Sequence, residues 1–203
     1  HVIIDIGANC GSTLASILNS NEKVNIYCIE PDPLFFYFLE ENLKVIKKNF
    51  PFSNIEILSK AVGNPRSKIE LIRDDEGTAM PISTDLDNGY ICEAFDSICE
   101  NINLDSLRLI KIDTDGFDAE VILSAKKTIN SHKPIIYFKC QIASLKHCEE
   151  YFEAINYLSS NGYTLWYLFD NFGGLITKTK DIMQIFNFIE YLWYQSINLA
   201  SST

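Results

Sequence analysis

The chain has 203 residues, of which 47% are hydrophobic and 12% aromatic, and its formal net charge at pH 7 is −10. A chain of this length and apolar content can bury one sizeable core, so we expect a single domain over residues 1–203. The acidic charge would repel a polyanion, and no N/D-P-P-Y motif for holding a flipped base is present, which argues against a nucleic-acid partner. No apolar run in the sequence is long enough to span a bilayer.

Two features concern the cellular location of the protein: the start of the sequence and its cysteines. The chain begins with His1 directly before a strand-like segment, and we expect a native N-terminal segment to precede it. The six cysteines include no C-x-x-C pair. Reduced thiols are therefore favoured over a disulfide framework, which predicts a cytoplasmic location.

The first expected element is a buried parallel strand over residues 2–6, because these residues are apolar and mostly β-branched. A G-x-x-x-G turn follows, from Gly7 to Gly11, and a helix comes after it. Such a turn allows close approach of the backbone, and its N–H groups can face an anionic or hydrogen-bonding ligand. The dinucleotide fingerprint G-x-G-x-x-G is absent, which favours S-adenosylmethionine (SAM) over NAD. A turn with a purely geometric role is the alternative.

Glu30 closes the next strand-like run, residues 24–29, about 20 residues after the glycine turn. Pro31 and Pro33 stop the strand there, and Pro33 fits the first turn of a helix that runs to about Lys48. A carboxylate at this strand tip can accept hydrogen bonds from both ribose hydroxyls of a nucleoside. The alternative is a charge that favours the helix start, but Asp32 can meet that need. We therefore assign Glu30 to ribose binding.

Strand-like and helix-like segments alternate along the rest of the chain. We expect strands over residues 54–61, 68–73, 107–113 and 134–139, an acidic loop over 74–87, helices over 117–131, 147–161 and 181–191, and a hairpin from 163–169 and 174–177. This alternation predicts an α/β fold with a doubly wound, mostly parallel sheet, closed by an antiparallel strand of the C-terminal hairpin. A ligand should lie across the carboxyl ends of the strands.

Three acidic side chains, Asp113, Asp115 and Asp118, gather where the strand over 107–113 ends. Methyl transfer to an alcohol requires removal of the hydroxyl proton, and Asp113 is best placed to act as the general base or to contact SAM. A divalent metal is the rival interpretation, because hard cations prefer clustered carboxylates. The ligand set of a calcium loop is incomplete, and we expect no metal. Asp118 is more simply an acidic residue at a helix start.

Five segments, taken together and in this order, resemble the FkbM-type SAM-dependent methyltransferases. They are residues 2–11, 29–33, 61–63, 109–116 and 133–136. The resemblance covers residues 2–139 and implies a class I, Rossmann-like methyltransferase domain that acts on hydroxyl groups of sugars or glycosylated small molecules. For the cofactor it indicates the following residues: Asp5, Gly7, Asn9, Gly11, Glu30, Pro31, Ala61, Val62 and Asp113.

The chain departs from the family at two places. The family motif after the fourth strand reads roughly K-I-D-x-E-G-x-E, and here Asp115 and Asp118 replace the two glutamates. Lys139 stands where the family usually has a glutamate at the end of the fifth strand. Asp113 and Lys139 are the candidate catalytic residues. The lysine can pair with Asp113 or Asp115, can mark a lost catalytic group, or can extend into solvent.

Three functions stay open at this point. The leading one is a SAM-dependent O-methyltransferase with a sugar, glycan or glycosylated small molecule as the acceptor. The second is a methyltransferase-like domain that has lost catalysis and serves binding or scaffolding. The third is a nucleotide-sugar or NAD-linked Rossmann enzyme, which the glycine spacing disfavours.

Overall fold

The computed structural model describes residues 1–20, 23–73, 79–87 and 89–200. The chain divides into two compact units, His1–Lys139 and Cys140–Thr203, and each is described by itself. The expectation of one domain over the whole chain stays a prediction. All six cysteines are free, as expected.

The first unit contains a five-stranded sheet in the order β3-β2-β1-β8-β9. Its strands are β1 (Val2–Ile6), β2 (Asn25–Ile29), β3 (Asn54–Leu58), β8 (Leu107–Ile112) and β9 (Ile135–Phe138). All four pairings are parallel, which confirms the predicted doubly wound sheet. The chain crosses over at β1, where one half of the sheet is built outward through β2 and the other through β8. This is the switch point at which open α/β sheets bind their ligands.

The helices of this unit are α1 (Ser12–Leu18), α2 (Pro33–Asn49), α3 (Phe95–Cys99), α4 (Asp118–Ser124) and α5 (Lys126–His132). Asp32 caps α2, because its side chain accepts hydrogen bonds from the N–H groups of Leu34 and Phe35. A core cluster that includes Leu14, Ile26 and Leu39 packs α1 and α2 against the sheet. The single helix expected over residues 117–131 is instead two helices, separated at Ala125.

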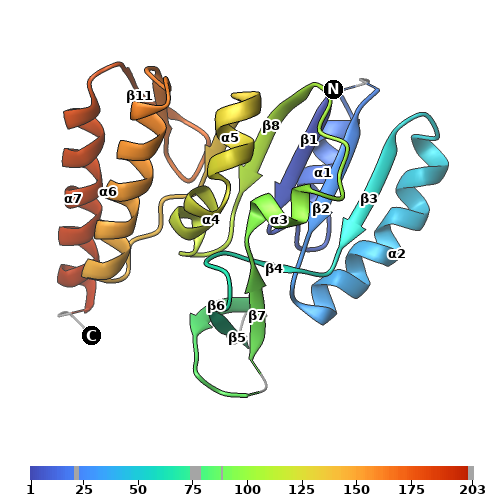
Figure 1. Cartoon of the computed structure of the whole chain (residues 1–203), viewed down its shortest axis with the longest axis horizontal. Coiled ribbons are helices and arrows are strands. Elements are labelled where there is room, and N and C mark those ends of the chain that lie inside the picture. Colours follow the sequence, from blue (N-terminus) through green and yellow to red (C-terminus); the bar gives the residue numbers. More distant parts are fainter. Residues whose placement is uncertain (21–22, 74–78, 88, 201–203) are drawn as a thin grey trace. The chain divides into compact units, whose positions relative to one another are not determined.

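A smaller four-stranded sheet has the order β4-β7-β5-β6. Its strands are β4 (Ala61–Val62), β5 (Lys68–Arg73), β6 (Ala79–Ser83) and β7 (Tyr90–Glu93). Figure 1 shows β5, β6 and β7 beyond the carboxyl ends of the parallel strands.

Two expectations for this region were wrong. The acidic segment 74–87, expected as a loop, contains β6, which pairs antiparallel with β5 from Ile69 to Arg73; residues 74–78 lie outside the described residues. Pairing with β5 determines that β6 is a strand, whereas the local composition predicted a loop. The strand expected over 54–61 ends at Leu58, and Ala61 belongs to the smaller sheet.

The second unit contains α6 (Leu145–Ser160), β10 (Trp166–Phe169), β11 (Leu175–Thr179) and α7 (Ile182–Ala200). The expected antiparallel hairpin is confirmed, but β10 and β11 form a separate two-stranded sheet. Within the described residues neither strand pairs with the five-stranded sheet, so the expected closure of that sheet by a hairpin strand is not found. Phe152 of α6 meets Phe186 of α7 edge to face, with ring centroids 5.0 Å apart. No described helix has the length and apolar content needed to cross a membrane.

Candidate active site

A narrow pocket of about 70 Å³ opens at the carboxyl ends of β1, β2 and β8, and the smaller sheet lines its other side. The turn after β1 contributes Gly7 and Asn9, and the residues after β8 contribute Asp113 to Asp115. The other lining residues are Ile6, Glu30, Pro31, Phe35, Lys60, Val62, Ile69, Leu71, Pro81 and Phe117. The pocket therefore lies at the switch point of the sheet.

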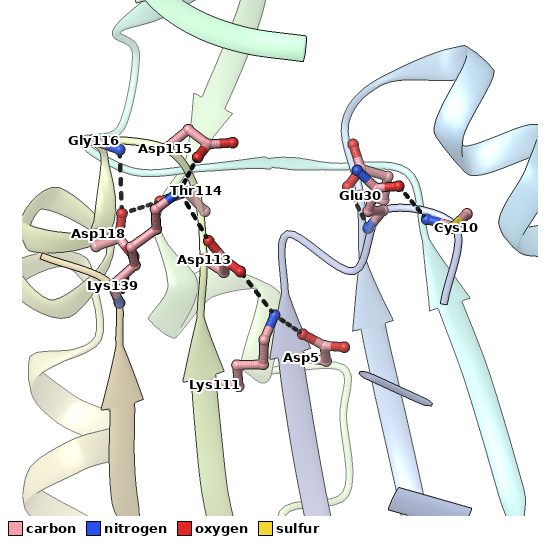
Figure 2. Close-up of polar contacts among 11 residues, drawn as sticks. Asp5, Cys10, Glu30, Lys111, Asp113, Thr114, Asp115, Gly116, Asp118 and Lys139 are labelled. Atoms are coloured by element: carbon pink, nitrogen blue, oxygen red, sulfur yellow. Dashed lines mark hydrogen bonds and ion pairs between the residues drawn. The ribbon is translucent and has the colours of Figure 1, made fainter. Parts of the chain in front are cut away.

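Glu30 is almost completely buried at the tip of β2 (Figure 2), and both of its carboxylate oxygens accept hydrogen bonds. Oε2 accepts a hydrogen bond from the backbone N–H of Asn9 at 2.8 Å, and Oε1 accepts one from the N–H of Asp32 at 2.8 Å. Burial raises the pKa of Glu30, and these two N–H groups oppose that rise. Because each oxygen has a second lone pair, the carboxylate is fixed and can still accept hydrogen bonds from a ligand.

The backbone N–H groups of the glycine turn are already used within the chain. Those of Gly7 and Ala8 donate to the carbonyl of Ile29, and the N–H of Gly11 donates to the carbonyl of Ala8. The N–H of Cys10 donates to Oδ1 of Asn9. The expectation that these groups face a ligand is not met, because the N–H groups hold the turn against β2 and present Glu30 to the pocket.

The two glycines of the turn are required for different structural reasons. A Cβ on Gly7, whose φ is +77°, would lie 1.9 Å from the carbonyl oxygen of Asp113, so the turn touches the end of β8 directly. A Cβ on Gly11, whose φ is +91°, would lie 2.9 Å from a methyl group of Leu39. Gly7 lines the pocket and Gly11 does not. The close approach at Gly11 is therefore to α2.

A line of alternating charges crosses the ends of β1, β8 and β9 (Figure 2). Lys111 donates from Nζ to Asp5 at 2.9 Å and lies 3.6 Å from Asp113. Lys139 donates from Nζ to Asp115 at 2.6 Å and lies 3.9 Å from Asp113. Asp113 thus sits between two ammonium groups, at a longer distance from each than its neighbouring aspartates.

Asp5 is fully buried and does not line the pocket. Burial raises its pKa, and the ammonium of Lys111 opposes the rise. Its Oδ2 atom has no hydrogen-bond partner among the residues that the structure describes. Sequence reasoning missed Lys111, although the sequence did hold a signal: residues two apart on a strand share a face, so Lys111 had to lie on the same face as Asp113.

Asp118 starts α4, as expected, and is completely buried. Its Oδ2 accepts hydrogen bonds from the Thr114 hydroxyl at 3.2 Å and the Gly116 N–H at 3.3 Å, while its Oδ1 accepts one from the Lys139 N–H at 3.3 Å. Burial raises the pKa of Asp118 to about 7. This side chain ties the turn after β8 to the end of β9 and so fixes the backbone that carries Asp113 and Asp115.

The structure brings most of the expected cofactor residues together. The expected residues that line the pocket are Gly7, Asn9, Glu30, Pro31, Val62 and Asp113, and those that do not are Asp5, Gly11, Ala61 and Lys139. Lys139 still reaches the site through Asp115. No three His, Cys, Asp or Glu side chains of the described residues are grouped so that they could hold a metal ion. Phe35 and Lys60 were not expected, because their place depends on how α2 and the β3–β4 turn face the pocket.

Comparison with known families identifies the chain. A model of the methyltransferase FkbM domain matches residues 5–165. The chain belongs to the FkbM methyltransferase family. This confirms the predicted family, the SAM-dependent methyltransferase class and SAM as the cofactor.

Two individual proteins add detail. The 2-O-methyltransferase NoeI of Sinorhizobium fredii (strain NBRC 101917 / NGR234) is 27% identical over 149 residues, which are 63% of this chain and 58% of that protein. The crystal structure of methyltransferase FkbM from Methylobacillus flagellatus KT is similar with a TM-score of 0.60 and 21% identity, over 83% of this chain and 40% of that one. The second similarity supports the fold. The chain spans little more than half the length of the first protein and less than half of the second.

Proposed function

We propose that this chain transfers the methyl group of SAM to a hydroxyl of a sugar, glycan or glycosylated small molecule. The observation that carries the proposal is the gathering of Gly7, Asn9, Glu30 and Asp113 around one pocket at the switch point of the sheet. Similarity to a 2-O-methyltransferase supports a hydroxyl acceptor. The free cysteines support a reducing, cytoplasmic location.

The residues present fit SAM in their chemistry. Glu30 would accept hydrogen bonds from the ribose hydroxyls, and the apolar side chains of Pro31, Phe35 and Val62 would cover the base. When bound, SAM supplies an electrophilic methyl group on its sulfonium sulfur. The pocket is far smaller than the roughly 300 Å³ at which ligand sites begin, so part of its lining would have to move to admit the whole cofactor.

Asp113 is the proposed general base. Its side chain is 43% exposed and lines the pocket, so an acceptor hydroxyl can reach its carboxylate. As the methyl group is transferred, Asp113 takes the hydroxyl proton. Lys111 and Lys139 hold the carboxylate from both sides, and Lys139 acts as a positioning residue through Asp115.

The second candidate is a domain that binds SAM without turnover. The observation in its favour is Lys139, because an ammonium paired with Asp115 stands where the resemblance places a glutamate. Incubation with SAM and a panel of sugars and glycolipids, followed by mass spectrometry, separates the two candidates. A product 14 Da heavier than the acceptor, as one added CH₂ requires, supports the enzyme. Tight binding of SAM in titration calorimetry with no product from any acceptor would favour the lapsed domain.

A further inference from the structure

A second and larger cavity, about 560 Å³, lies between the start of α2 and the smaller sheet. Its lining includes Asp32 and Tyr37 at the start of α2, Glu70, Leu71 and Arg73 on β5, and Tyr90 on β7. We name this cavity the acceptor groove. Its volume falls within the roughly 300–1,000 Å³ of small-molecule sites. Neither the cofactor contacts nor the proposed base explains it.

The acceptor groove adjoins the cofactor pocket through two described residues. Leu71 lines both cavities. Asp32 lines the groove, while its backbone N–H donates to Oε1 of Glu30 in the pocket at 2.8 Å. The two cavities therefore share Leu71 as a lining residue, so a ligand in the groove would lie next to the cofactor pocket.

The groove presents two kinds of surface. Tyr37 and Tyr90 are 52% and 39% exposed, so both residues are accessible for stacking. Nη2 of Arg73 donates to both carboxylate oxygens of Asp32, at 2.6 and 2.7 Å, and the Asp32 side chain is only 2% exposed. The buried aspartate thus fixes the guanidinium at one nitrogen, and the Arg73 side chain is 43% exposed toward solvent.

These surfaces match a sugar. The C–H faces of a pyranose ring can stack on the tyrosines, while its hydroxyls accept hydrogen bonds from Arg73 and donate to Glu70. Among the described residues, the charged lining consists of two carboxylates, Asp32 and Glu70, and one guanidinium, Arg73, which leaves an excess of one negative charge. A phosphorylated or otherwise anionic sugar would be repelled, so the groove favours a neutral one.

We propose that the acceptor groove binds the sugar part of a neutral glycan acceptor, whose reacting hydroxyl extends past Leu71 to Asp113. This inference rests on the proposed function. The rival occupant is the adenine of SAM. The cofactor pocket already offers Pro31, Phe35 and Val62 next to Glu30, so the base has apolar partners there without entering the groove.

The test uses Tyr37→Ala and Tyr90→Ala, with Tyr191→Ala on α7, whose side chain is 55% exposed, as the matched control. The full chain is loaded with S-adenosylhomocysteine, and binding of methyl glycosides of neutral hexoses and of their 6-phosphates is measured by saturation-transfer NMR. Each groove variant should weaken binding of the neutral glycoside about three- to tenfold, the range for loss of one aromatic contact. Affinity for S-adenosylhomocysteine by calorimetry should stay within about twofold, and Tyr191→Ala should match the parent in both measurements.

Weaker S-adenosylhomocysteine binding with unchanged glycoside binding would assign the groove to the cofactor and overturn the inference. A parent that binds no neutral glycoside, or that prefers the 6-phosphates, would also overturn it. If a sugar is methylated and its KM is unchanged by both tyrosine substitutions, the groove is not the acceptor site, while the proposed function is supported. A sugar that binds through Tyr37 and is never methylated would support the groove as a sugar site and argue against the proposed methyltransferase function.

Discussion

Gly7→Ala probes the contact on which the site is built. The added Cβ would lie 1.9 Å from the Asp113 carbonyl oxygen and 2.8 Å from its carbon, which are backbone atoms that no side-chain rotation can move. A left-handed φ such as the +77° of Gly7 costs a non-glycine residue about 1–2 kcal/mol, and overpacking adds about 1–3 kcal/mol. Reduced entropy of the unfolded chain returns about 0.5 kcal/mol. We expect a net loss of about 1.5–4.5 kcal/mol in the free energy of unfolding.

Gly11→Ala is the matched control, because Gly11 lies in the same turn with a φ of +91° and its Cβ would meet only the flexible tip of Leu39. With the same gain of about 0.5 kcal/mol from the unfolded chain, we expect a net loss of about 0.5–1.5 kcal/mol there. Urea unfolding should be followed by far-UV circular dichroism, since both tryptophans, Trp166 and Trp193, lie in the second unit. Gly7→Ala should also weaken SAM binding, because separation of the turn from β8 displaces Asp113. Equal losses for the two variants would refute the proposed contact between the turn and β8.

Four further outcomes are expected. Glu30→Ala should weaken SAM binding by about 1.5–3 kcal/mol in calorimetry, and unchanged affinity would remove Glu30 from the ribose site. Asp113→Asn should lower the methylation rate about 100-fold or more with far less change in SAM affinity; a fully active variant would leave the base unassigned. Lys139→Glu should lower the rate about tenfold, because it places a carboxylate beside Asp113 and Asp115, whereas activity gained from an inactive parent would identify a lapsed enzyme. Burial raises the pKa of Asp118 to about 7 in the folded chain, compared with about 4 in the unfolded chain. Between about pH 4 and about pH 7 the Asp118 carboxyl is therefore protonated in the folded chain and ionised in the unfolded chain. Its contribution to the free energy of unfolding should thus fall as pH rises from about 4 to 7, and urea titrations should show a weaker pH dependence for Asp118→Asn.

The main sheet could be predicted because its strands carry local signals. The apolar run of β1, the glycines that follow it and the prolines after Glu30 each depend on neighbouring residues, and the structure has all three features where the sequence indicated them. Of the smaller sheet, β5 was predicted with its bounds of 68–73, but β4 and β6 could not be predicted in the same way. The conformation of β6 depends on its pairing with β5, and that of the two-residue strand β4 on its pairing with β7. Neither segment therefore has an alternating hydrophobic pattern that predicts a strand.

The site shows the same division. Glu30 could be placed from its position at a strand tip, and Asp113 from the end of β8. The register of β1 against β8 sets Asp5 opposite Lys111, a pairing between residues more than 100 positions apart that no spacing rule reveals. The acceptor groove also depends on tertiary structure, because Tyr37 and Tyr90 come from elements that only the fold brings together.

The charges around Asp113 explain how a lysine at the end of β9 is compatible with Asp113 as the proposed base. The two short ion pairs go to the flanking aspartates: Lys111 to Asp5 at 2.9 Å and Lys139 to Asp115 at 2.6 Å. Among the described residues, Asp113 has the longer contacts of 3.6 and 3.9 Å to the two lysines, and it is the most exposed of the three carboxylates. Two ammonium groups thus offset two of the three negative charges, and the third is left on the side chain that faces the pocket. A carboxylate held in this way is oriented and open to a hydroxyl proton, which is the arrangement that a general base requires.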